Sequence, residues 1–120
     1  MPKLVIEIVH GPYGKENAYA GMFIAMGWVA VGNDAIVVLH SDGVYAARKG
    51  QKDPMKEISL PSVEKQVMDI LGEGGRVIAD RTCIEVRGID RDMLIEGVEV
   101  LDSEALVELV YKEGERVLTL

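Results

Sequence analysis

Two stretches of mostly β-branched apolar residues, at 4–9 and 35–39, constrain the fold more than any other feature of the chain. Neither stretch alternates between apolar and polar residues, and only Glu7 is charged. Strands that are buried on both faces have this pattern, which is typical of parallel sheets covered by helices. Residues 16–31 lie between the two stretches and carry apolar side chains three or four positions apart, which predicts a helix. The order strand, helix, strand predicts an α/β domain.

The rest of the chain continues this alternation. Helices are expected at residues 44–48, at 61–71, between Asp90 and Gly97, and between Ser103 and Gly114, and strands at residues 76–79, 98–101 and 116–120. Three of these helices have expected N-caps, namely Ser41 or Asp42, Asp90, and Ser103. The polar residues 49–60 predict a loop. Right-handed crossovers between parallel strands then predict a three-layer α/β/α sandwich, with a mainly parallel sheet of about five strands. We expect one domain over residues 1–120, and the strand order stays open.

The charge and hydropathy of the chain limit its partners and its location. The 120 residues contain 13 Lys and Arg against 20 Asp and Glu, which gives a net charge of −7. This balance argues against direct binding to nucleic acid, because binding to phosphates depends on clusters of Lys and Arg. The first residues lack the core of a signal peptide, and no apolar run reaches the roughly 20 residues of a membrane span. We therefore expect a cytoplasmic protein with no membrane partner.

Three of the predicted strands end in unusual polar residues. The first strand is followed by His10 and the second by His40, while the third runs into the segment 80–83, which contains Asp80 and Cys83. Ligands of open parallel sheets gather outside the carboxyl ends of the strands. We therefore expect Cys83 at this edge, in a cleft that it shares with His10 or His40.

Cys83 is the only cysteine of the chain, so no internal disulfide can form. A free cysteine is often a small buried hydrophobic residue without chemical function. The functional hypothesis is a thiolate nucleophile, which needs partial exposure and positive neighbours. Arg81 and Arg87 flank Cys83 in the sequence and can supply that positive charge. Such a thiol can accept a sulfur atom and hold it as a persulfide.

The two histidines have several interpretations. His10 and His40 can be structural, or they can assist proton transfer at Cys83. Together with Cys83 and Asp80 they also supply four potential zinc ligands, but their spacing matches no zinc motif. We expect no metal and no other cofactor. The glycine-rich residues 10–14 favour a tight turn over an anion-binding loop, and four carboxylates show no pairing and are expected to be solvated: Glu7, Glu85, Glu96 and Glu99.

Four segments resemble those of a known family. They are Gly11-Pro12-Tyr13-Gly14, Ser41-Asp42-Gly43-Val44 with residues 48–52, Cys83-Ile84-Glu85-Val86-Arg87-Gly88-Ile89, and Gly97-Val98 with residues 116–120. In this order and spacing the whole chain resembles the DsrE/DsrF-like family, which includes the Tus proteins of the sulfur relay used in tRNA thiolation. Some members have two cysteines three residues apart before the Arg-Gly pair. Here Asp80 occupies the first of these positions, so only a single-thiol carrier is compatible with the resemblance.

The resemblance implies an α/β/α domain, a homo-oligomer (trimer or hexamer) and a cysteine that handles sulfane sulfur. The leading hypothesis is a small sulfur carrier or sulfurtransferase that holds sulfur on Cys83 between a donor and an acceptor protein. Arg81 and Arg87 would favour the thiolate, and four residues would line the pocket: His10, Tyr13, His40 and Asp80. One alternative is a non-covalent binding module for an anion, a nucleotide or a metal. Another is an assembly subunit in which the cysteine is inert.

The predicted helix over residues 16–31 independently indicates oligomerisation. Its large apolar side chains fall on nearly every face of the helix: Tyr19, Met22, Phe23, Ile24, Met26, Trp28 and Val29. A three-layer domain covers only one side of each helix. We therefore expect the outer side of this helix to face a partner subunit.

Overall fold

The computed structural model describes residues 3–51 and 61–120, and within these ranges five strands form one sheet. The strands are β1 (Leu4–Ile8), β2 (Ala35–Leu39), β3 (Arg76–Asp80), β4 (Glu99–Leu101) and β5 (Arg116–Thr119). Their order across the sheet is β4-β3-β2-β1-β5, and each pairing of neighbours is parallel. The predicted parallel sheet of about five strands is therefore confirmed, and its order is now known.

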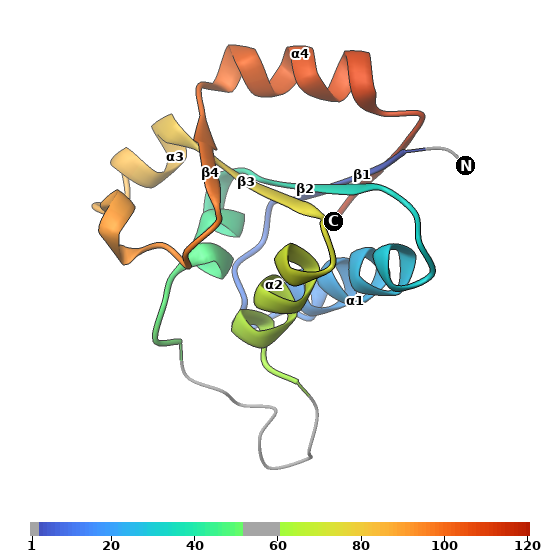
Figure 1. Ribbon diagram of the computed structural model, residues 1–120. Coiled ribbons are helices and arrows are strands. Elements are labelled where there is room, and N and C mark those ends of the chain that lie inside the picture. The colour runs from blue at the N-terminus through green and yellow to red at the C-terminus, as the bar shows by residue number, and fades with distance from the viewer. Residues whose placement is uncertain (1–2, 52–60) are drawn as a thin grey trace.

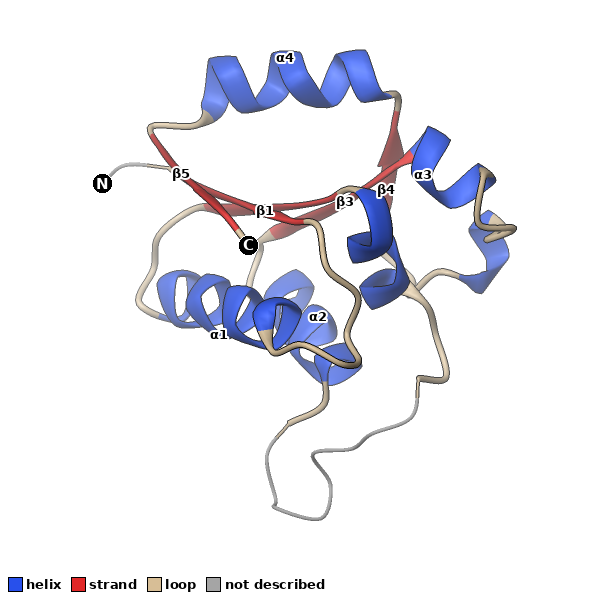
Figure 2. Cartoon of the chain, turned by 180° about the vertical axis from the view of Figure 1, so that it is seen from behind, coloured by secondary structure: helices blue, strands red, loops and turns tan. Residues whose placement is uncertain are grey.

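Helices cover both faces of the sheet (Figures 1 and 2). One face carries α1 (Asn17–Ala30), α2 (Val63–Gly72) and the 3₁₀ helix η1 (Ser41–Ala47), while α4 (Ser103–Glu113) lies on the other. The short helix α3 (Arg81–Glu85) and the 3₁₀ turn η3 (Arg91–Met93) extend from the end of β3. This arrangement confirms the three-layer α/β/α sandwich.

An apolar core lies on each face of the sheet. The larger core, which includes side chains of α1 and α2, contains Ile6, Ile8, Met22, Val37, Leu39 and Ile70. The buried members of the smaller core, beneath α4, are Val5, Ile36, Val38, Ile78 and Leu106. Successive side chains of a strand point to opposite faces, so β1 and β2 supply apolar residues to both cores. This two-sided burial explains why their sequences show no regular alternation of apolar and polar residues.

Two short elements differ from the prediction. The segment 80–83 had no predicted helix, but β3 continues through Asp80 and α3 begins at once at Arg81. The helix predicted between Asp90 and Gly97 is wrong, because only the three residues of η3 are helical there. The backbone N–H of Ile95 donates instead to the carbonyl of Ala47. This hydrogen bond holds the chain against the end of η1 and prevents the helix from continuing.

The predicted N-caps were partly wrong. Neither Ser41 nor Asp42 caps η1, because the helix begins at Ser41 and His40 occupies the N-cap position. Asp90 has the predicted N-cap position of η3 but makes no capping hydrogen bond with its side chain. Asp102, and not Ser103, precedes α4. The predicted loop over residues 49–60 is outside the described residues from position 52 onward.

The outer face of α1 is apolar. The residues of α1 that face the sheet and α2 are buried: Ala18, Gly21, Met22, Ala25 and Val29. On the opposite side, 59% of Phe23 and 40% of Ile24 are exposed, and Val31 at the end of the helix is 72% exposed. No charged residue occurs between Asn17 and Val31. Within residues 3–51 and 61–120, no helix has both the length and the apolar character needed to cross a membrane.

Candidate functional site

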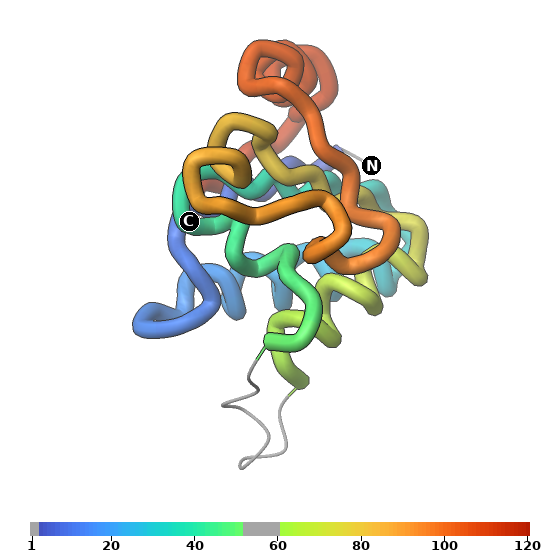
Figure 3. Tube along the Cα trace, turned by 90° about the vertical axis from the view of Figure 1, so that its left-hand side faces the viewer, coloured from blue at the N-terminus to red at the C-terminus, as the bar shows by residue number. Residues whose placement is uncertain are grey.

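The carboxyl ends of β1, β2 and β3 meet at one edge of the sheet, because these three strands are neighbours and parallel. Figure 3 looks toward this edge, where the segments that follow the three strands come together. His10, His40 and the segment 80–83 are therefore at the same edge, as the sequence predicted. Their side chains, however, have different partners.

Asp80 is the centre of this edge. Its side chain is almost fully buried, with only 3% of the residue exposed. Its Oδ1 accepts hydrogen bonds from the backbone N–H groups of Thr82 (3.0 Å) and Cys83 (3.3 Å). The Ser103 hydroxyl is 2.9 Å from both carboxylate oxygens, and Nδ1 of His40 is 3.0 Å from Oδ2. These donors compensate the cost of burying a carboxylate.

The same contacts set the protonation of Asp80. Burial by itself raises the pKa of this carboxyl group. The hydrogen bonds from Ser103, His40 and the backbone of Cys83 outweigh burial and hold the pKa of Asp80 below its ordinary value. Asp80 is therefore ionised at neutral pH. An ionised carboxylate only accepts hydrogen bonds, so the Nδ1 of His40 carries the proton of their shared bond.

His40 lies between two carboxylates. Its Nδ1 contacts Asp80, while its Nε2 is 3.7 Å from Oε1 of Glu7, which is too long for a direct hydrogen bond. The other oxygen of Glu7 accepts a hydrogen bond from the Thr119 hydroxyl at 2.9 Å. Glu7 was expected to be solvated, and that expectation was wrong. A row of polar groups thus crosses the edge of the sheet from β5 to β3.

Cys83 lies in α3 and is partly exposed. Its Sγ accepts a hydrogen bond from the backbone N–H of Ser41, at 3.2 Å. Ser41 has a φ of 51°, and no other non-glycine residue in 3–51 or 61–120 has a positive φ. Such a conformation costs on the order of 1–3 kcal/mol and persists only where the surroundings enforce it.

Close packing at Gly43 helps to enforce the position of η1. Gly43 is buried, and a Cβ atom at this position would collide with the carbonyl oxygen of Ile8 at the end of β1. Only glycine allows the backbone of η1 to approach β1 so closely. The first turn of η1, which includes Ser41, is thereby held against the carboxyl edge of the sheet.

Both arginines near Cys83 are paired with carboxylates. Nε and Nη2 of Arg87 are each 3.0 Å from Oδ1 of Asp42, and its Nη1 donates to the backbone carbonyl of Cys83 at 3.0 Å. Nη1 of Arg81 is 2.8 Å from Oδ1 of Asp102. Arg87 therefore holds the backbone of Cys83, whereas Arg81 points toward the start of α4. Their influence on the thiolate stays a prediction.

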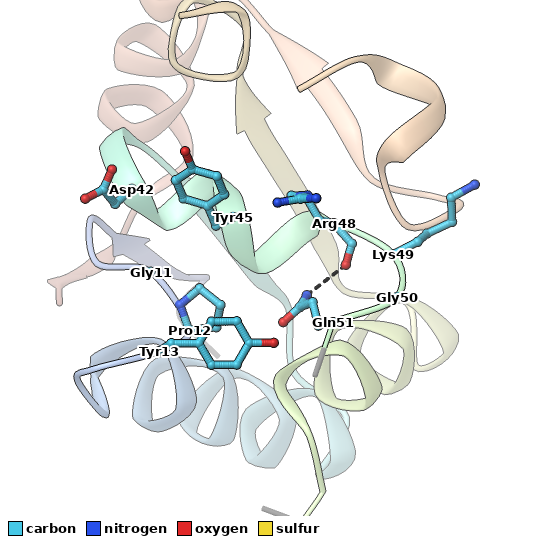
Figure 4. Close-up of a pocket in the computed structure, with 9 residues that line it drawn as sticks. All are labelled: Gly11, Pro12, Tyr13, Asp42, Tyr45, Arg48, Lys49, Gly50 and Gln51. Atoms are coloured by element: carbon cyan, nitrogen blue, oxygen red, sulfur yellow. Dashed lines mark hydrogen bonds between the residues drawn. The ribbon is translucent and has the colours of Figure 1, made fainter. Parts of the chain in front are cut away.

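His10 and Tyr13 lie apart from the Asp80 contacts. Nδ1 of His10 is 3.1 Å from the carbonyl oxygen of Leu120, which follows β5 on the far side of β1. Tyr13 lines a cavity of about 430 Å³ next to the site (Figure 4). The carboxylate of Asp80 thus brings His40 and Cys83 together, while His10 and Tyr13 have other surroundings.

The cavity lies between the loop after β1 and the residues that form and follow η1. Its lining consists of Gly11, Pro12, Tyr13, Asp42, Tyr45, Arg48, Lys49, Gly50 and Gln51. Figure 4 shows Tyr45 and Arg48 on one side and Pro12 and Tyr13 across from them. The guanidinium carbon of Arg48 is 6.0 Å from the ring centroid of Tyr45. Asp42 connects the cavity to Cys83, because it both lines the cavity and pairs with Arg87.

The described residues offer no ready metal centre. Within 3–51 and 61–120, no group of three or more His, Cys, Asp or Glu residues is placed so that it could hold a metal ion. The four potential zinc ligands that the sequence provides therefore do not converge there. What converges is a partly exposed thiol, a backbone donor to its sulfur and a buried carboxylate.

The chain is similar to other proteins in both sequence and structure. The chain is 30% identical over 115 residues to an uncharacterized protein from Methanopyrus kandleri. The aligned region covers 96% of this chain and 91% of that protein. It is 29% identical over 117 residues to an uncharacterized protein from Methanocaldococcus jannaschii, with 98% of each covered. The crystal structure of the ychN protein from E. coli matches with a TM-score of 0.87 and 27% identity, over 100% of both chains.

A more distant structure shows the same fold. A protein of unknown function from Methanobacterium thermoautotrophicum matches with a TM-score of 0.73 and 19% identity, again over 100% of both chains. The family model described as the DsrE/DsrF-like family matches residues 3–120. The chain therefore belongs to the DsrE/DsrF-like family, as its sequence segments indicated.

Proposed function

We propose that this protein carries sulfane sulfur as a persulfide on Cys83 and passes it to the thiol of a partner protein. The observation that supports this most is the hydrogen bond from the Ser41 N–H to the Cys83 Sγ, at 3.2 Å. A donor fixed in the backbone stabilises negative charge on the atom that it faces, and a thiolate is the attacking form of cysteine. Partial exposure of Cys83 gives a donor access to the sulfur.

The chemistry needs no oxidant or reductant. The thiolate of Cys83 attacks the outer sulfur of a donor persulfide and forms a new S–S bond, while the S–S bond of the donor breaks and its electron pair leaves on the donor thiolate. An acceptor thiolate then attacks the outer sulfur on Cys83 in the same manner, and Cys83 leaves as a thiolate. The Ser41 N–H faces the negative sulfur before loading and again after delivery.

Asp80 and His40 act in this proposal as positioning residues. Asp80 accepts from the backbone N–H of Cys83 and so fixes the first turn of α3, and His40 holds the side chain of Asp80. The resemblance places Asp80 where some relatives have a second cysteine. Cys83 is the only thiol of the chain, so a persulfide on it has no internal thiol to attack it. Removal of the sulfur then depends on an external thiol.

Mass spectrometry tests this function directly. After incubation with a persulfide donor, the native protein should gain one sulfur of about 32 Da, and Cys83→Ser should gain none. Addition of a small thiol should restore the original mass. A native protein that stays unmodified while it is folded would contradict the proposal and would favour a non-covalent binding module.

A homo-oligomer is the assembly that we propose for this carrier. Phe23, Ile24 and Val31 expose an apolar surface along the outer side of α1, and no charge interrupts it. Exposed apolar patches of this kind mark interaction surfaces. Sedimentation at micromolar concentration should show a trimer or a hexamer, and Phe23→Asp should dissociate it. A stable monomer of the native chain would contradict this assembly.

A further inference from the structure

Arg48 and Lys49 are two neighbouring cations among the residues that line the cavity. Within residues 3–51 and 61–120, neither Arg48 nor Lys49 forms a salt bridge, although the chain has a net charge of −7. Six of the other described cations are each paired with an Asp or Glu: Lys3, Lys65, Arg76, Arg81, Arg87 and Lys112. Lys15, Arg91 and Arg116 also form no salt bridge within the described residues, but they do not line the cavity. Charge left open on a concave surface attracts an anion.

The lining of the cavity indicates the size and type of that anion. A volume of about 430 Å³ is within the range of small-molecule sites. Pro12 and the rings of Tyr13 and Tyr45 give it apolar walls, as Figure 4 shows. The Lys49 side chain points away from these walls in Figure 4. A bare inorganic anion would use only the charge of Arg48 and leave the walls without contact. A ligand with an organic body and a carboxylate would use both.

Asp42 lines the cavity and belongs to the turn of η1 that contacts Cys83. Asp42 follows Ser41, whose N–H donates to Cys83 Sγ. Arg87 neutralises Asp42 and also donates to the carbonyl of Cys83, so Asp42 does not repel an anionic ligand as a free carboxylate would. The first residue of η1 therefore contacts the thiol, and the second lines the cavity.

We propose that the cavity binds the body of a low-molecular-weight organic persulfide that carries a carboxylate, with the carboxylate at Arg48. This inference rests on the proposed function and names its donor class. The bound donor presents its outer sulfur to the Cys83 thiolate. The new S–S bond forms on Cys83, the S–S bond of the donor breaks, and the organic thiolate leaves with the electron pair.

Binding can be measured without sulfur transfer. Cys83→Ser, which cannot be loaded, is titrated calorimetrically with S-methylglutathione, an organic carboxylate without a free thiol. We expect a single site, and about tenfold weaker binding when Arg48→Gln is added, because one charge-assisted contact is lost. Arg116→Gln is the matched control, since Arg116 is also an exposed arginine without a salt bridge but does not line the cavity. Equal binding by both variants, or no binding at all, would overturn the cavity as the site.

Loading rates provide the second readout. The native protein is incubated with glutathione persulfide or with the persulfide of glutathione dimethyl ester, which lacks both carboxylates. We expect about tenfold faster loading by the acid, and Arg48→Gln should remove this preference while thermal unfolding confirms that the variant is folded. Equal loading by both donors would overturn the inference but support the carrier function. Binding without any loading would overturn the persulfide chemistry and support an organic-anion site.

Discussion

Two groups of polar side chains lie close together at the carboxyl edge of the sheet, and their charges are satisfied in opposite ways. Around Asp80, four donors occupy the two oxygens of a buried carboxylate, and the start of α3 is fixed as a result. At the neighbouring cavity, Arg48 and Lys49 have no carboxylate partner in the described part of the chain. The first arrangement holds one geometry, whereas the second leaves charge available to a molecule that arrives from solvent. In our proposal, positioning of the sulfur and recognition of its donor are therefore carried out by different residues.

The largest expected effect is on stability. Asp80→Ala removes the buried carboxylate and leaves the partly buried donors of Ser103 and His40 without a partner, so we expect a loss of about 2–4 kcal/mol in the free energy of unfolding. Arg48→Ala should cost less than about 0.5 kcal/mol, because Arg48 is exposed. Urea unfolding measures both. Asp42→Ala is the control at the same edge and should cost at most about 1 kcal/mol. Similar losses in the free energy of unfolding for Asp80→Ala and Arg48→Ala would contradict the difference between the Asp80 contacts and the cavity.

The second largest effect is expected in acid, which should reduce the contribution of Asp80 to the free energy of unfolding. The pKa of Asp80 is lowered from 3.8 in the folded protein, so below that value the unfolded chain binds more protons than the native one. The contribution of Asp80 to the free energy of unfolding is therefore present above about pH 4 and is lost as the pH falls through the folded pKa. Urea unfolding from pH 7 to pH 2 should show this loss, and Asp80→Asn should show less of it. Identical acid profiles for the two proteins would contradict the assigned role of the carboxylate.

A smaller effect is expected at Ser41, where the two groups meet. Ser41→Val places a β-branched residue at a φ of 51°, which should cost about 1–2 kcal/mol and move the N–H away from Cys83 Sγ. Loading of Cys83 with sulfur should then slow. Ser41→Gly keeps both the N–H and the conformation, so its stability should change by less than about 0.5 kcal/mol and its loading rate should persist. If Val and Gly at this position load sulfur equally fast, the N–H is not a determinant of reactivity.

Much of the fold was predictable because its longer strands and helices have local patterns of apolar residues in the sequence. The apolar stretches at 4–9 and 35–39 predicted β1 and β2, and the spacing of apolar residues predicted α1 and α2. Parallel strands bring their carboxyl ends to one edge, which placed His40 and Cys83 at the same site before the strand order was known. Short helices were harder to predict from the sequence. The five residues of α3 are too few for a periodic pattern, and η3 stays short because Ile95, two residues after it, makes a long-range hydrogen bond to Ala47 of η1.

The missed contacts of the site depend on strand order and backbone conformation. Glu7 meets Thr119 only because β1 pairs with β5, and it approaches His40 only because β1 also pairs with β2. Ser103 has the sequence signature of an N-cap, but its hydroxyl donates to Asp80 across the sheet edge. The positive φ of Ser41 could not be predicted, because serine, unlike glycine, gives no indication of a positive φ in the sequence. The neighbouring Gly43 is the residue whose close packing against β1 indicates how tightly this turn is held.

The single cysteine also restricts how copies of this chain can assemble. If two Cys83 residues could meet, the thiolate of one copy would attack the inner sulfur of the persulfide on the other. A disulfide between the copies would form and hydrosulfide would leave, so the cargo would be released to solvent instead of delivered. In the homo-oligomer that we propose, built on the outer side of α1, the thiols would have to stay isolated from one another. Under the function that we propose, a carrier with one thiol per chain would keep its sulfur through kinetic isolation, and the quaternary arrangement would be part of that protection.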